Sequence, residues 1–97
     1  MEIKIKSLKF DADQKLIAFV EKKVSKLEKF FDGLETVEVV LSLLQEPDNK
    51  KVKIMTHVPG QELVIERHAK TFEDAVTEAA DAMKEKITRF KEKQSEA

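Results

Sequence analysis

The chain contains no cysteine, which excludes disulfide bonds, a thiolate nucleophile and any zinc site with cysteine ligands. It has only two glycines, Gly33 and Gly60, and they lie too far apart to form a glycine-rich phosphate-binding loop. The first ten residues, MEIKIKSLKF, hold no long apolar run, so they match neither a secretory signal nor a membrane span. We therefore expect a cytoplasmic protein with no cofactor and no metal site.

The length and composition are those of a globular protein. The hydrophobic share is 41% and the charged share is 38%, unlike the low hydrophobicity of disordered chains. A chain of 97 residues is long enough to bury a modest core. We predict a single domain over residues 1–97, in which residues 93–97 form a tail that can fray.

Positive charge is concentrated in two segments, although the formal net charge is only −1. Residues 1–33 carry eight lysines and six acidic residues, and residues 84–93 carry five basic and two acidic residues. Residues 34–83 between them carry five basic and ten acidic residues. The total charge alone argues against a nucleic-acid binder, but this distribution leaves two basic segments that are suited to a polyanion.

The spacing of apolar residues predicts the first two elements. Residues 2–10 alternate between apolar and charged side chains, which is typical of a half-buried strand that ends or bulges near Ser7. Apolar residues then recur at helical spacing, which predicts a helix over residues 12–31. Asp11 is the expected N-cap of this helix, with Gln14 closing a capping box.

Three strands and a second helix follow. Period-two apolar spacing predicts strands over residues 36–45, 51–58 and, shorter, 63–66. Residues 71–91 are expected to form a helix that starts at a Thr71 cap and buries one apolar stripe. The predicted fold class is α+β in the order β-α-β-β-β-α, with a four-stranded mixed sheet and two helices packed on one face.

Charged side chains are sorted by side on both predicted helices, at about 100° per residue. The first helix carries Glu21 and Glu28 on one flank, and its other flank is basic: Lys15, Lys22, Lys26 and Lys29, with Lys23 nearer the apolar stripe. One flank of the second helix carries Lys86, Arg89 and Lys93, and the other carries Lys84 and Lys91. Such ridges suit a phosphate backbone, although solvated helix faces are the simpler interpretation. The second helix exceeds the strands in length, so its basic end is expected to extend past the sheet.

The segment 19–32, FVEKKVSKLEKFFD, resembles the first-helix signature of the ribosome hibernation promoting factor family, which includes the ribosome-associated inhibitor of translation. The shared pattern is a lysine, two residues, Lys-Leu-Glu, a variable position, an aromatic residue, phenylalanine and aspartate. The alternating strand 37–41, the Val-Pro-Gly turn at 58–60 and the basic helix end 89–93 agree with the same family. The resemblance covers essentially the whole chain and its order of elements.

This resemblance implies a protein that binds the small ribosomal subunit, through its 16S-type rRNA, where messenger and transfer RNA would lie. It also implies that the protein is no enzyme and blocks the decoding channel of idle ribosomes in stationary or stressed cells. By position, the RNA-facing residues are Lys23, Lys26, Lys29, Arg89, Lys91 and Lys93, and Lys22 and Lys86 extend the two ridges. We expect a monomer that binds neither a membrane nor a small-molecule substrate.

Some positions depart from the family pattern. Glu85 stands where many relatives have a basic residue, Lys86 where glutamine is common, and Thr77 where aspartate is frequent. Phe10 and its neighbours differ from the usual polar loop after the first strand. The chain also stops after the second helix, so we expect a short form without the C-terminal domain with which long members pair ribosomes.

The residues themselves leave alternatives open. A protein-interaction module or a homodimer would use the open face of the sheet, which mixes apolar and charged side chains. A small α+β enzyme would need a convergent nucleophile and base, whereas the two histidines, His57 and His68, are isolated from such groups. Phe30 falls beside the lysine flank, where it either packs in the core or stacks on an RNA base.

Overall fold

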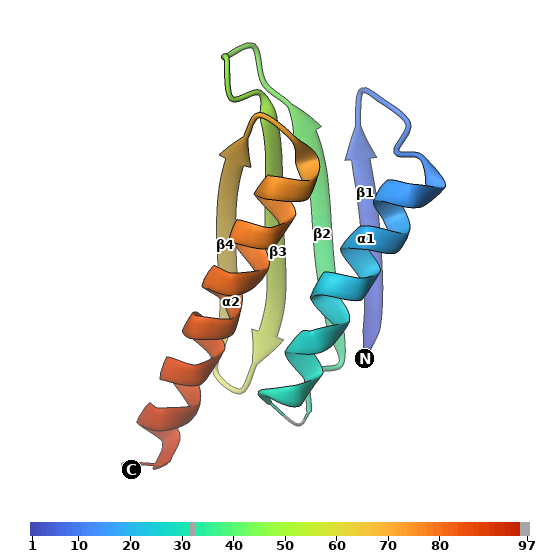
Figure 1. Cartoon of the computed structure of the whole chain (residues 1–97). Helices are drawn as coiled ribbons and strands as arrows, with labels where there is room; N and C mark the ends of the chain where they lie inside the picture. Colours follow the sequence, from blue (N-terminus) through green and yellow to red (C-terminus); the bar gives the residue numbers. More distant parts are fainter. Residues whose placement is uncertain (32, 96–97) are drawn as a thin grey trace.

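The computed structural model describes residues 1–31 and 33–95 and contains a four-stranded sheet with two helices on one face (Figure 1). In chain order the elements are β1 (Glu2–Leu8), α1 (Gln14–Ser25), the 3₁₀ turn η1 (Lys26–Lys29), β2 (Thr36–Leu43), β3 (Lys50–Val58), β4 (Gln61–Ala69) and α2 (Phe72–Ser95). The strands lie in the order β1-β2-β3-β4, with β1 parallel to β2 and the other neighbours antiparallel. The predicted α+β fold and its order of elements are confirmed.

The sheet and the helices form two layers. Figure 1 shows α1 over β1 and β2, and α2 over β3 and β4, with the two helices side by side and starting at the same end. Thr71 caps α2 as predicted, because its Oγ1 accepts a hydrogen bond from the Asp74 N–H at 3.1 Å. The helix runs through Ser95, and its C-terminal end projects beyond the sheet, as its length predicts (Figure 1).

The core lies between the sheet and the facing stripes of the two helices. Val37, Val39 and Leu41 on β2 alternate inward and are fully buried, as the period of two requires. Thr56 on β3 is the one buried polar side chain among the described residues. Its hydroxyl donates a hydrogen bond to the Thr36 carbonyl at 3.0 Å, so this polar group is not left unsatisfied.

The first helix is shorter than predicted and starts at a different cap. Asp13 is the N-cap, and its Oδ1 accepts a hydrogen bond from the Leu16 N–H at 2.8 Å, so the predicted cap at Asp11 is wrong. The α-helix ends at Ser25 and the chain continues as η1, instead of remaining α-helical to residue 31. Helix ends often tighten in this way, because their last carbonyls lack α-helical donors.

The structure confirms one of the two alternatives predicted for β1 and corrects the prediction for β4. β1 ends near Ser7, as predicted, and it does so without a bulge, because its register with β2 is continuous to Leu8 and Lys9 with a φ of 67° then turns the chain. β4 extends well past the predicted range 63–66, since it pairs with β3 from Gln61 to Ala69. Glu66, Arg67 and His68 near the end of β4 are exposed and polar, so hydropathy alone did not indicate a strand there.

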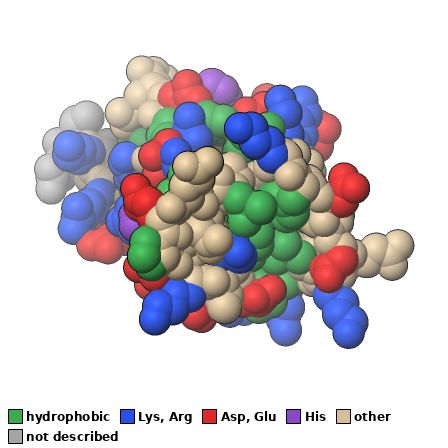
Figure 2. Space-filling model, turned by 90° about the horizontal axis from the view of Figure 1, so that it is seen from above, with side chains coloured by type: hydrophobic (Ala, Val, Ile, Leu, Met, Phe, Trp, Pro, Cys, Tyr) green, Lys and Arg blue, Asp and Glu red, His purple; other side chains and the backbone are tan. Residues whose placement is uncertain are grey.

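Apolar side chains are exposed at the end of the molecule where both helices begin. Figure 2 views the molecule from this end, and hydrophobic side chains gather there among charged ones. Leu8 is 40% exposed and Leu43 is 41% exposed, and each ends a strand that points to this end. Phe10 stacks on Phe72 with ring centroids 5.0 Å apart, so the loop after β1 covers the start of α2.

Candidate nucleic-acid interface

The 3₁₀ turn η1 changes how the lysines of the first helical segment are presented. A 3₁₀ helix has three residues per turn, so side chains three positions apart lie directly above one another. Lys26 and Lys29 begin and end η1 and therefore share one line, whereas a continuous α-helix would separate them by about 60°. Both side chains are exposed, and the buried Leu27 between them anchors the turn to the core.

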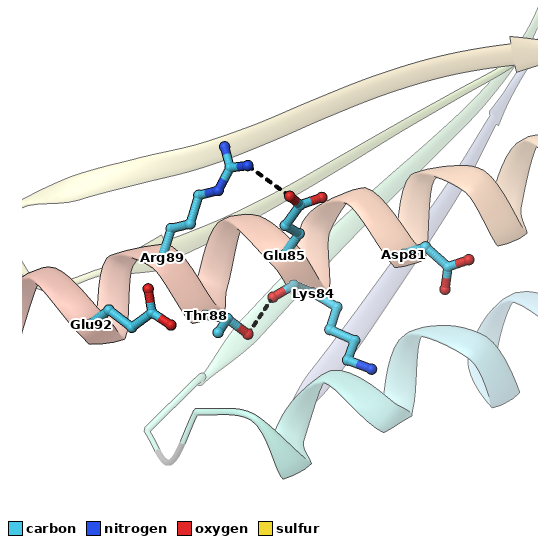
Figure 3. Close-up of a pocket in the computed structure, with 6 residues that line it drawn as sticks. All are labelled: Asp81, Lys84, Glu85, Thr88, Arg89 and Glu92. Atoms are coloured by element: carbon cyan, nitrogen blue, oxygen red, sulfur yellow. Dashed lines mark hydrogen bonds and ion pairs between the residues drawn. The ribbon is translucent and has the colours of Figure 1, made fainter.

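A groove of about 300 Å³ lies between this segment and α2. Its polar lining consists of four lysines: Lys23, Lys26, Lys29 and Lys84. Its apolar lining is formed by Leu27, Phe30 and Ala80. Figure 3 shows the side chain of Lys84 extending from α2 toward the α1 side of the molecule. The groove therefore combines four lysine side chains with a small apolar lining.

Two of these lysine ammonium groups lie over aromatic rings. The Lys84 Nζ is 4.6 Å from the centroid of the Phe30 ring, and the Lys23 Nζ is 5.5 Å from that of Phe19. Within residues 1–31 and 33–95, no carboxylate forms an ion pair with any of the four groove lysines. The nearby Glu28 is directed elsewhere, since its Oε1 contacts the amino group of Met1 at 2.8 Å. Because carboxylates do not neutralise it, the groove is suited to bind an anion such as a phosphate.

Two predicted residues of α2 point away from this groove. Lys86 reaches the edge of the sheet, where its Nζ donates a hydrogen bond to the Val64 carbonyl of β4 at 3.0 Å. Arg89 donates to the Glu85 carboxylate at 2.7 Å, and both side chains are mostly exposed. The flank formed by Lys86 and Arg89 therefore does not continue the lysine ridge of α1.

The structure separates the eight predicted RNA-facing residues into two groups. Lys23, Lys26 and Lys29 are brought together in the groove. The other five do not line it: Lys22, Lys86, Arg89, Lys91 and Lys93. Lys84 was missed, although the helical period placed it on the flank opposite Lys86. Periodicity identifies a flank, but only tertiary packing shows which flank faces the neighbouring helix.

A larger depression of about 510 Å³ on the outer side of α2 is less suited to an anion (Figure 3). Three carboxylates line it, namely Asp81, Glu85 and Glu92, together with Lys84, Thr88 and Arg89. The Arg89 guanidinium is engaged by Glu85, and the Thr88 hydroxyl donates to the Lys84 carbonyl at 2.9 Å. This acidic face of α2 therefore borders the lysine groove without neutralising it.

The open face of the sheet has mixed charge. One row across the four strands shows this: Lys6 of β1 pairs with Val40 of β2, Val40 with Lys53 of β3, and Lys53 with Glu66 of β4. Lys51 approaches Glu66 at 3.6 Å, an exposed pair of small energetic value. This alternation is typical of a solvated surface and forms no basic stripe comparable to the groove.

The part of the chain that the structure describes shows no sign of a metal site or a membrane-spanning helix. Residues 1–31 and 33–95 contain no group of three or more histidine, aspartate or glutamate side chains placed to hold a metal ion. None of their helices is long and apolar enough to cross a membrane. His57 is exposed on the open sheet face, as expected for a polar surface residue.

Comparison with known proteins gives a consistent result over almost the whole chain. Residues 3–95 match the model of the family described as Sigma 54 modulation protein / S30EA ribosomal protein. A ribosome hibernation promoting factor of Azotobacter vinelandii is 30% identical over 96 residues, which cover 99% of this chain and 88% of that protein. Another, from Pseudomonas putida KT2440, is 27% identical over 94 residues, which cover 97% of this chain and 90% of that protein.

Solved structures agree with the fold. The N-terminal domain of Protein Y from Thermus thermophilus has a TM-score of 0.81 at 26% identity, covering 93% of this chain and 99% of that one. A ribosomal subunit interface protein from Coxiella burnetii also has a TM-score of 0.81, at 16% identity, covering 94% and 98%. The second likeness concerns the fold alone. The family match over residues 3–95 confirms the resemblance seen in the sequence, and the chain belongs to the Sigma 54 modulation protein / S30EA ribosomal protein family.

Proposed function

We propose that the protein binds the small ribosomal subunit through its 16S-type rRNA, in the channel that messenger and transfer RNA occupy, and so silences idle ribosomes. The groove between η1 and α2 carries this proposal, because its four lysines form no ion pair with a carboxylate of the described residues. The names of the relatives, ribosome hibernation promoting factors, support the same role. The protein would act as a monomer in the cytoplasm of stressed or stationary cells.

Lys23, Lys26 and Lys29 are the proposed direct contacts to rRNA phosphates, and Lys84 joins them. Phosphate contacts of this kind position a protein on RNA and make its binding salt-dependent. The other predicted residues are proposed as peripheral contacts: Lys91 and Lys93 near the projecting end of α2, and Lys22, Lys86 and Arg89 outside the groove. The function requires no chemical step, because occupying the channel is sufficient to exclude messenger RNA.

The experiment is co-sedimentation of the purified protein with small ribosomal subunits at low salt, beside the Lys26→Glu/Lys29→Glu variant. Lys4→Glu/Lys6→Glu is a matched control, because it makes the same change in net charge at two exposed positions on the open sheet face. We expect the wild type and the control to pellet in stoichiometric amounts, and the groove variant to remain in the supernatant. Failure of the wild type to pellet would contradict the proposal.

A control variant that lost pelleting, while the groove variant kept it, would instead favour an interaction through the open sheet face. Addition of a messenger RNA fragment to bound subunits tests the location. If the protein occupies the messenger channel, the fragment should displace it. Stable binding of both at once would contradict the proposed position but not the binding itself.

A further inference from the structure

Most phenylalanine rings near the helices pack against another aromatic ring, but within the described part of the chain the ring of Phe30 does not. Phe31 packs against Phe90 with centroids 5.7 Å apart, and Phe10 stacks on Phe72. Among the described residues, no other ring contacts Phe30, and only the Lys84 ammonium lies over it. The side chain is half-buried and lines the lysine groove. The ring thus packs partly against the core and also lines the groove.

The backbone holds this ring in place. Phe30 follows η1 directly, and its N–H donates a hydrogen bond to the Leu27 carbonyl at 3.1 Å. Leu27 is itself only 2% exposed, so the turn that carries the ring is anchored in the core. A pre-positioned aromatic surface loses little conformational freedom when a ligand stacks on it.

A nucleobase can replace the Lys84 ammonium on the face of the Phe30 ring with a gain in binding energy. An exposed ammonium gains little from an aromatic face, whereas a nucleobase stacked on the same face gains more. The flexible Lys84 side chain would then be available for the phosphate attached to that base. Lys26 and Lys29 lie on one line at the opposite wall, where they can contact neighbouring phosphates.

The size of the groove restricts the kind of RNA that can use this ring. A volume of about 300 Å³ is at the lower end of the range for small-molecule sites, and it suits one nucleotide better than a helix. Bases inside a duplex are stacked on their neighbours, so they cannot lie flat on a protein ring. We infer that the groove holds a single unpaired RNA nucleotide, its base stacked on Phe30 in place of the Lys84 ammonium and its phosphates contacted by Lys26, Lys29 and Lys84. This inference rests on the proposed function and names the form of RNA that the site takes.

Tryptophan fluorescence provides the test, because the chain contains neither tryptophan nor tyrosine. Phe30→Trp places a single fluorophore at the proposed stacking position. Phe19→Trp is the matched control, since Phe19 is also half-buried beneath a lysine ammonium but does not line the groove. Each variant is titrated at low salt with a short oligouridine and with a blunt RNA duplex of equal length, and binding is followed independently by anisotropy of labelled RNA.

We expect oligouridine to quench the emission of the Phe30→Trp variant and to leave that of the Phe19→Trp variant almost unchanged, while the duplex quenches neither. Phe30→Leu, which keeps an apolar side chain without a π face, should bind oligouridine about ten-fold more weakly and the duplex equally well. Oligouridine binding without quenching, or an unchanged affinity of Phe30→Leu, would overturn the inference. Absence of oligouridine binding would overturn it too.

Co-sedimentation separates this inference from the proposed function. If the wild type pellets with small subunits and the Lys26→Glu/Lys29→Glu variant does not, the proposed function stands whatever the fluorescence shows. If the wild type does not pellet, the proposed function fails independently of any RNA stacking on Phe30.

Discussion

Neutralising two groove lysines should change how binding to ribosomal subunits responds to salt. The perturbation is Lys26→Gln/Lys29→Gln, which removes two of the four positive charges that line the groove. Both side chains are exposed and form no ion pair among the described residues, so their loss should hardly affect folding. The matched control is Lys4→Gln/Lys6→Gln on β1, which lowers the net charge equally on the open sheet face.

The magnitude follows from counterion release. Each phosphate neutralised contributes about −0.7 to −0.9 to the slope of log K against log salt concentration, so four groove lysines give a slope of about −3. The slope of the variant should be shallower than that of the wild type by about 1.5, because two phosphate contacts are lost while Lys23, Lys84 and the peripheral contacts remain. Between about 50 and 200 mM salt, the affinity of the variant should then fall by a factor about eight-fold smaller than that of the wild type.

The assay is a binding isotherm with small ribosomal subunits, measured at four or more salt concentrations for the three proteins. The control variant should reproduce the wild-type slope, because its lysines lie away from the groove. Equal slopes for the groove variant and the wild type would refute the assignment of phosphate contacts to Lys26 and Lys29. An equal reduction of the slope in both double variants would show that binding depends on the net charge of the protein rather than on the groove lysines.

Two further predictions concern the elements that present the site. Asp13→Ala should lower the free energy of unfolding by about 1 kcal/mol, because it removes the N-cap of α1, whereas Asp11→Ala should change it by less than about 0.5 kcal/mol. Urea denaturation distinguishes them, and equal effects would contradict the cap assignment. Leu27→Ala should cost about 2–5 kcal/mol by opening a cavity beneath η1, a large share of the stability of a small domain. A loss below about 1 kcal/mol in the same measurement would show that η1 is not anchored as described.

The sequence was sufficient to predict the order of elements because the apolar period was clear over most of each element. Val37, Val39 and Leu41 alternate, and the structure buries all three against the helices. The error at the start of the first helix arose because two neighbouring residues could serve as its N-cap. Asp11 and Asp13 are both able to cap a helix, and only the structure shows that the Asp13 carboxylate reaches a free N–H.

The site was predictable only in part. Lys23, Lys26 and Lys29 were identified from the family-like segment, and the structure places them in one groove. Lys84 was missed because the choice between the flanks of α2 depends on contacts between helices that are distant in sequence. The 3₁₀ turn was also not foreseen, since the spacing of Val24, Leu27 and Phe31 fits a continuous α-helix.

The acidic outer face of α2 has a consequence for the competition that this protein meets in a cell. A domain with a large excess of positive charge is held by any RNA, so most copies would be sequestered on transcripts and unstructured tails. Here Asp81, Glu85 and Glu92 stand beside the groove, and the net charge of the chain is −1. An RNA surface that meets both regions at once is repelled by the carboxylates, whereas one shaped to enter the groove alone is not. If the protein binds ribosomes as proposed, the carboxylates beside the groove would therefore lower its affinity for RNA that cannot enter the groove alone.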